Sequence, residues 1–84
     1  EFTAHNILGR LYLKAGDAAA AVQSLETAIR LAPKSAESHF ALANAYQRTG
    51  KPAEAAKHRR IFAELEKARS EERITGVRRV EAQP

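Results

Sequence analysis

Residues 5–16 read HNILGRLYLKAG and residues 39–50 read HFALANAYQRTG, so one pattern occurs twice at a spacing of 34 residues. Histidine, leucine, tyrosine and glycine recur at matching positions, and Ala21 and Ala55 continue the same register. A fixed period of this length is typical of a stacked array, in which each unit buries its apolar face against its neighbours. The repeat therefore favours a protein that binds partners over one that transforms them.

Four segments carry the residue patterns of amphipathic helices. Apolar residues recur at helical spacing over residues 3–15, 18–31, 36–49 and 52 to about 73. Gly16 and Gly50 stand where a left-handed residue closes a helix, and Pro52 suits the first turn of the next one. Because Gly76 and the paired arginines that follow it lack periodicity, we expect residues 75–84 to be frayed or disordered.

The first unit contains His5-x2-Leu8-Gly9-x2-Tyr12, followed by Ala21-x3-Leu25 and Pro33. This spacing resembles that of the tetratricopeptide repeat, whose consensus has an aromatic residue, leucine, glycine and tyrosine, and then alanine, phenylalanine and proline. In this family the two helices of each repeat approach closely at the small residues. The resemblance implies that Gly9 and Ala21 allow this approach in the first unit.

The second unit matches the same pattern only in its first half. It keeps the register through Ala55, but Arg59 occupies the large apolar position and Lys67 replaces the closing proline. The resemblance covers residues 2–69 and looks like the C-terminal end of a bacterial-type array. It implies an all-α fold of two antiparallel helix-turn-helix repeats, an α-solenoid with an extended C-terminal helix. The predicted units are residues 2–35, 36–69 and, for the helix extension and tail, 70–84.

Large apolar side chains on the inner stripes of these helices form the predicted core. They are Leu8, Tyr12, Leu25, Ile29, Leu42, Tyr46, Phe62 and Leu65. Each is expected to contribute roughly 1.5 to 3 kcal/mol of burial.

The resemblance also implies a ligand groove, because the first helices of such repeats line a concave surface. Six residues face away from the predicted core at positions related by the repeat: Asn6, Arg10, Lys14, Phe40, Asn44 and Arg48. We interpret them as a site for an acidic or carboxylate-bearing peptide, since arginine binds carboxylates and Phe40 offers an apolar contact. The alternative is that they are ordinary solvated helix faces. The carboxylate clamp of some family members is not matched here.

The charge distribution and the uncovered end of the array leave two further partner classes open, nucleic acid and a second copy of the chain. Residues 57–84 hold eight Lys and Arg against five Glu, but alternation of the two signs favours a solvated face over a nucleic-acid site. Because the sequence begins at Glu1 without methionine, we expect it to be a piece of a longer protein, with Ala4, Ile7 and Leu11 partly uncovered. Uncovered ends of an array favour a homodimer or an exchange of helices between chains.

The sequence predicts no enzyme, no metal site and no cofactor. The chain lacks cysteine, a glycine-rich phosphate loop and any His-x3-His spacing. His5 and His39 hold the aromatic position of the repeat and are expected to pack half-buried between helices, whereas His58 is expected to stand apart. No apolar run could cross a bilayer and no signal-peptide pattern is present, so we expect a soluble module, with the cytoplasm slightly favoured.

Overall fold

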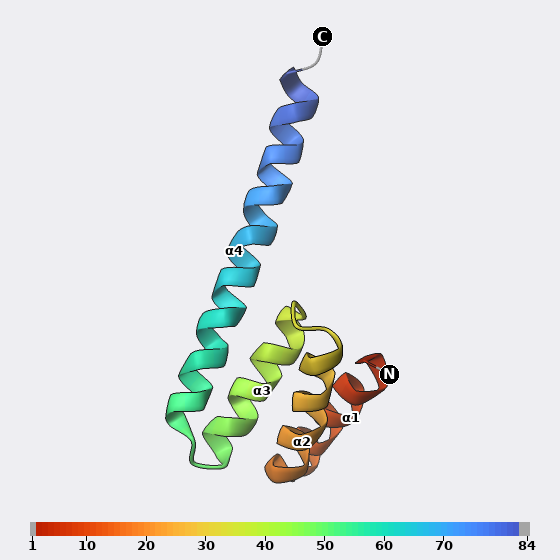
Figure 1. Cartoon of the computed structure of the whole chain (residues 1–84), viewed down its shortest axis with the longest axis vertical. Helices are drawn as coiled ribbons and strands as arrows, with labels where there is room; N and C mark the ends of the chain where they lie inside the picture. Colours follow the sequence, from red (N-terminus) through yellow and green to blue (C-terminus); the bar gives the residue numbers. More distant parts are fainter. Residues whose placement is uncertain (1, 83–84) are drawn as a thin grey trace.

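The computed structural model describes residues 2–82 and, within them, the side chains of residues 3–74. Its helices are α1 (Phe2–Ala15), α2 (Ala18–Leu31), α3 (Ala36–Arg48) and α4 (Pro52–Ala82). Helices α1 and α2 form one hairpin, α3 and α4 form the second, and α2 packs against α3 to join them (Figure 1). The all-α, two-hairpin architecture predicted from the repeat is confirmed.

The two hairpin turns have the same hydrogen bonds, 34 residues apart. Gly16 and Gly50 adopt φ angles of 86° and 76°, the left-handed region that glycine enters without a Cβ penalty. After each glycine, the next backbone N–H reaches back to a tyrosine carbonyl: Asp17 N lies 2.9 Å from Tyr12 O, and Lys51 N lies 2.9 Å from Tyr46 O. Both halves of the chain therefore turn in the same way.

Helix starts are fixed by different residues in the two repeats. The Asp17 carboxylate accepts from Ala20 N at 3.1 Å at the start of α2, and Ser35 Oγ accepts from Ser38 N at 3.3 Å at the start of α3. These contacts pair backbone donors that the first turn of a helix leaves without an internal partner. Helix α4 begins instead with Pro52, which has no N–H to satisfy.

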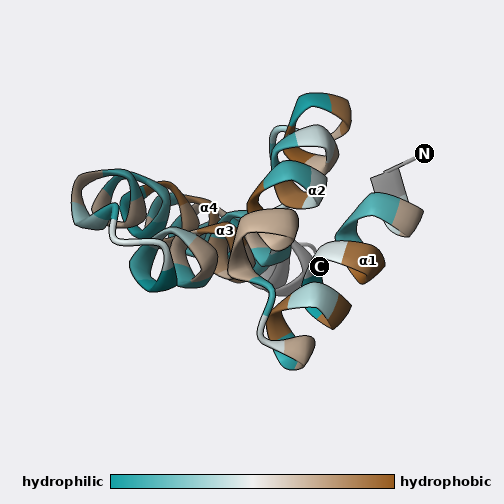
Figure 2. Cartoon of the chain, turned by 90° about the horizontal axis from the view of Figure 1, so that it is seen from below, coloured by the Kyte–Doolittle hydropathy of each residue, from teal (hydrophilic) through white to brown (hydrophobic). Residues whose placement is uncertain are grey.

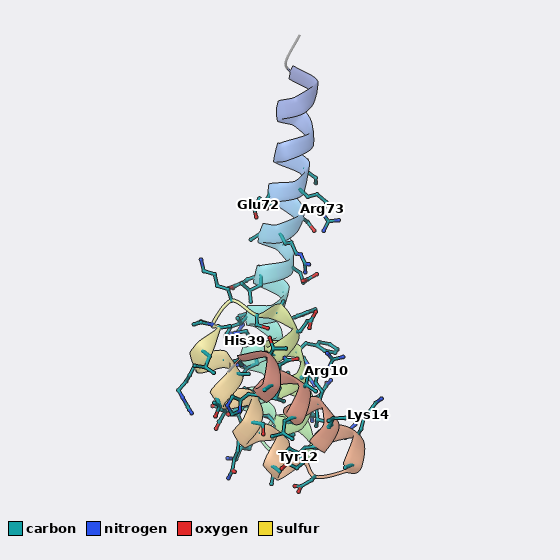
Figure 3. All side chains as sticks on the ribbon, turned by 90° about the vertical axis from the view of Figure 1, so that its right-hand side faces the viewer. Arg10, Tyr12, Lys14, His39, Glu72 and Arg73 are labelled. Atoms are coloured by element: carbon teal, nitrogen blue, oxygen red, sulfur yellow. The ribbon has the colours of Figure 1, made fainter. Side chains whose placement is uncertain are left out.

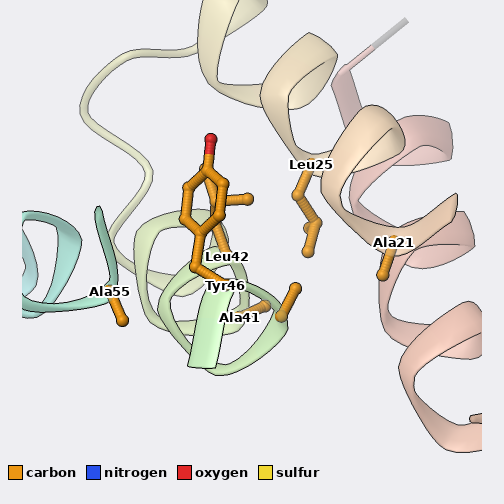
Figure 4. Packing of buried hydrophobic residues seen from close by; sticks show 7 residues of the cluster. Ala21, Leu25, Ala41, Leu42, Tyr46 and Ala55 are labelled. Carbon is orange, nitrogen blue, oxygen red and sulfur yellow. The ribbon is translucent and has the colours of Figure 1, made fainter. Parts of the chain in front are cut away.

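The core lies around α3, which packs against α2 and against α4. Leu25 of α2 and Leu42 of α3 are its largest fully buried side chains, and Tyr46 packs beside them (Figure 4). Small residues fill the close approaches between helices: Ala21, Ala41, Ala45 and Ala55. Tyr12 and Ile29 pack against this cluster from its edge and are partly buried.

Close helix packing depends on a glycine in α1, as the sequence predicts. A Cβ built on Gly9 would lie 2.5 Å from Leu25 Cγ and 2.7 Å from Leu25 Cδ2. Leu25 is completely buried and has no room to withdraw. The equivalent residue of the second repeat, Ala43, is also completely buried.

The predicted core is wrong at one position, and at four others, Tyr12 and Ile29 included, the side chain is only partly buried. Leu8 retains 42% of its accessible surface, whereas Leu42, its equivalent one repeat later, retains 1%. Helix α2 covers the outer face of α3, but within residues 2–82 no helix covers that face of α1 (Figure 2). Phe62 and Leu65 of α4 are only half-buried.

Helix α4 continues past its expected end near residue 73 and reaches Ala82, projecting well beyond the other three helices (Figure 1). Residues 75–82, which belong to the stretch expected to be frayed or disordered, have a helical backbone. A glycine such as Gly76 costs a helix only about 1 kcal/mol relative to alanine, and no proline follows until Pro84. Residues 83–84 lie outside the described part. No helix in residues 2–82 combines the length and apolarity needed to span a membrane.

Candidate functional site

A groove runs between α1 and α3 and is closed on one side by Phe62 of α4. Five of the six predicted site residues line it: Arg10, Lys14, Phe40, Asn44 and Arg48. Arg10 and Lys14 lie one helical turn apart on α1 and project on the same side of the molecule (Figure 3). The repeat period thus brings the matching positions of two hairpins to one surface.

The sixth predicted residue, Asn6, is not in the groove. Its side chain is buried, and its Nδ2 donates a hydrogen bond of 2.6 Å to Ser38 Oγ on α3. Ser38 Oγ in turn receives a 3.0 Å hydrogen bond from Ser35 Oγ. Asn6 therefore joins the two repeats, because α1 and α3 approach closely enough at this end to enclose its amide. The prediction that Asn6 contacts a ligand does not fit this position.

Two arginines of the groove already have partners. Arg48 Nη1 donates to the backbone oxygen of Leu13 at 2.9 Å, which orients its guanidinium and ties the end of α3 to α1. Arg10 Nη1 lies 3.9 Å from Glu37 Oε2 across the groove, and both side chains are largely exposed. An exposed pair at this distance contributes little to stability, so a ligand carboxylate could replace Glu37 at low cost.

The apolar part of the groove is larger than the sequence predicts. Phe40 remains 50% exposed although its ring lies 5.1 Å from that of Phe62, at an interplanar angle of 45°. Ile7 and Leu11 of α1 also line the groove and are exposed, as expected for residues left partly uncovered. From the sequence, these two residues are expected to be uncovered for want of a neighbouring helix, and Phe62 is expected in the core. The signal that could have found them is their position beside Arg10 and Phe40 on the helix surface.

Behind the groove, Tyr46 joins α3 to α2. Its hydroxyl donates a hydrogen bond to Glu26 Oε2. Burial, together with the neighbouring Glu26 carboxylate, raises the pKa of the Tyr46 phenol, so the hydroxyl stays protonated and keeps donating. This contact ties the second hairpin to the first.

His58 does not stand apart, contrary to the sequence prediction. Its Nδ1 lies 2.9 Å from Nδ1 of His39, and both rings are buried between α3 and α4. The signal was present in the spacing, because His58 lies one turn after Ala55 on the face of α4 that meets α3. The expectation for His39 is confirmed in position, although the ring is nearly fully buried rather than half-buried.

The arrangement presents a surface suited to binding, with no evident catalytic constellation among the described residues. Cationic, amide and apolar side chains meet on one open surface of an ordered scaffold, a combination suited to an extended or helical segment of another chain. In the part of the chain that the structure describes, no three His, Asp or Glu side chains are placed to hold a metal ion.

Fold and groove together define an α-helical repeat protein with a surface groove between equivalent helices. Family comparison agrees: a model described as a TPR repeat matches residues 9–50, and one described as a tetratricopeptide repeat matches residues 38–73. The chain belongs to the tetratricopeptide repeat family. Repeats of this family generally serve as protein–protein interaction modules and are typically non-enzymatic. A search of curated proteins finds no significant match.

Proposed function

We propose that this chain binds a partner peptide in the groove between α1 and α3, and that the peptide carries carboxylates beside an apolar side chain. The observation that carries the proposal is the convergence of Arg10, Lys14 and Arg48 around the half-exposed ring of Phe40. Three cations face a single groove carboxylate, Glu37, so the surface attracts negative charge. Asn44 supplies an amide that hydrogen-bonds either a peptide N–H or a carbonyl.

The dimensions limit the length of peptide that fits. An extended segment of about eight residues spans about 26 to 29 Å, which is comparable to the 27 Å intermediate dimension of the molecule. A peptide of this length can contact both repeats at once. An aromatic or leucine side chain near its centre would cover the Phe40 and Phe62 rings, and flanking carboxylates would reach the cations of α1 and α3.

Fluorescence anisotropy with a labelled peptide tests the proposal. The probe is a peptide of about eight residues with Glu on either side of a central Phe, compared with the same peptide in which Gln replaces Glu. We expect the Glu peptide to bind more tightly than the Gln peptide. Replacing both Arg10 and Lys14 by Gln should weaken binding of the Glu peptide about twofold to thirtyfold, the sum of two exposed ionic contacts.

A charge-matched control distinguishes peptide binding in the groove from general electrostatic attraction to the chain. Lys67 and Arg73 are exposed on α4 and lie outside the groove, and replacing both by Gln changes the net charge equally. Equal weakening by the two double variants would contradict the proposal. So would a single-stranded oligonucleotide that binds more tightly than the peptide and loses affinity steeply with salt, because that result favours the basic face of α4.

Self-association is a second candidate, favoured by the exposed leucine of α1. Leu8 is 42% exposed at a position where the next repeat buries its leucine, and Ile7 and Leu11 extend the apolar surface. A second copy that covers this face would form a homodimer or exchange a helix.

Sedimentation at hundreds of micromolar protein tests this candidate. Leu8→Lys should convert a dimer to a monomer because two ammonium groups would enter one interface, whereas Leu31→Lys should not, since the equally exposed Leu31 lies at the end of α2. A wild-type chain that stays monomeric over this range contradicts the second candidate and leaves the peptide groove unaffected.

A further inference from the structure

Two histidines face each other inside the second hairpin. The Nδ1 atoms of His39 and His58 are 2.9 Å apart, and the ring centroids are 5.1 Å apart with planes 24° from parallel. The centroid separation is close to the nitrogen–nitrogen distance plus the two ring radii, so the rings lie nearly edge to edge. This geometry places an N–H on one ring in line with a lone pair on the other.

The surroundings determine which ring donates. His39 Nε2 lies 2.8 Å from the carbonyl oxygen of Pro33, which can only accept, so Nε2 carries a hydrogen. In a neutral His39 the other nitrogen, Nδ1, is then an acceptor. His58 must therefore donate through Nδ1–H. The hydrogen bonds form one chain that links the α2–α3 loop, α3 and α4.

This chain of hydrogen bonds is complete when both rings are neutral. Two protons taken up by the pair would set two N–H groups against each other at 2.9 Å and break the contact. A proton added to His58 would keep the bond but would place a cation between helices where both rings are buried. A proton on His58 is thus opposed by the packed hairpin, and protons on both rings are incompatible with the contact.

The charged groups around His58 come from two helices. Burial is the main cause that lowers the pKa of His58, followed by repulsion from His39 and from Lys57 on the same helix. Glu54 of α4 and Glu26 of α2 act in the opposite direction. Tyr46 of α3 lies beside the ring, with centroids 5.6 Å apart, and contributes no charge because its hydroxyl stays protonated.

We propose that the buried His39–His58 pair is a proton-sensitive contact that holds α4 against α3 and releases it when the solution becomes mildly acidic. Its basis is the edge-to-edge geometry, the carbonyl that fixes the tautomer, and the location of both rings between the helices. In the unfolded chain a histidine takes up a proton near pH 6.5. Burial between the helices opposes this proton on His58 in the folded chain, so the unfolded state binds more protons below about pH 6.5 and stability falls as the pH is lowered.

The released contact also bears on the groove, because α4 carries Phe62 at its wall. Loosening α4 would withdraw this ring from Phe40. The inference itself concerns the stability of the hairpin, however, and its test uses no ligand, so it stands or falls independently of the proposed peptide binding.

Urea unfolding of the whole chain at pH 7.5 and pH 5.5, followed by circular dichroism, tests the inference. A histidine that stays neutral in the folded state lowers the folding equilibrium constant about tenfold on reaching pH 5.5. Between the two pH values, the folding equilibrium constant of the wild-type chain should therefore fall about tenfold more than that of His58→Asn. In that variant the side-chain amide still donates a hydrogen bond to His39 but takes up no proton.

The repeat itself provides the matched control. His5 is the first-repeat equivalent of His39, and Ser24, the equivalent of His58, stands where its histidine partner would be. His5→Asn should therefore keep the wild-type difference between the two pH values. If wild type and His58→Asn lose stability in parallel, the proposal is wrong. Should His58→Asn fail to fold, a nuclear magnetic resonance titration of the wild-type ring decides: a midpoint for His58 at or above 6.5 overturns the proposal, and a lower one supports it.

Discussion

Leu8 and Leu42 provide an unusually well-matched pair of sites for testing the stacking of the two repeats. They are the same residue at the same repeat position, and they differ in retaining 42% and 1% of their accessible surface. Mutation to alanine removes three carbon groups, a transfer free energy of about 2.4 kcal/mol when the side chain is fully buried. With the cavity left behind, Leu42→Ala should cost about 3 to 5 kcal/mol. Leu8→Ala should cost about 1 to 1.5 kcal/mol, because less surface is buried and water can fill the space.

Urea unfolding at low protein concentration measures both losses, and the gain in helix propensity on changing leucine to alanine cancels between them. A Leu42→Ala chain that is already unfolded without urea still ranks as the larger loss. Equal losses would refute the reasoning, since they would mean that a surface absent from residues 2–82 covers Leu8. Repeating the measurement at high concentration then shows whether a second copy supplies that cover.

Three further substitutions test separate contacts. Gly9→Ala should destabilise the chain by about 1 to 3 kcal/mol despite better helix propensity, and should become neutral or stabilising in a Leu25→Ala background that removes the clash. Tyr46→Phe should cost about 1 to 2 kcal/mol in urea unfolding by breaking the bond to Glu26, and a loss below about 0.3 kcal/mol would show that the bond is not formed. Glu37→Gln should tighten binding of the acidic peptide severalfold in anisotropy, because it frees the arginine across the groove; weaker binding would place the peptide elsewhere.

Local patterns predict most of this fold because each depends on a few neighbouring residues. Gly16, Gly50 and Pro52 fix the turns through their own backbone preferences, and Gly9 signals close packing through the absence of a side chain. The helical backbone at the far end of α4 is not predicted, because the local signals there are weak. A single glycine is a weak breaker, and the charged residues around it are compatible with a helix.

The errors in the site have a different physical origin. Asn6 lies on the groove face by periodicity, but the approach of α1 to α3 at Ser38 encloses it. The spacing of residues within α1 carries no information about the distance between these two helices. Leu8 matches a core position whose cover comes from a neighbouring repeat. The pairing of His39 with His58 depends on the register of two antiparallel helices, which is set by tertiary packing rather than by either helix alone.

The most direct measurement of the central claim is an amide chemical-shift titration of the labelled chain with the acidic peptide. Two repeats stacked in register predict that the largest changes fall together on α1 and α3, at Arg10, Lys14, Asn44 and Arg48, and saturate with one binding constant. Residues of α4 beyond Leu65 should change little. Changes that concentrate on that part of α4, or that affect one repeat without the other, would contradict the account.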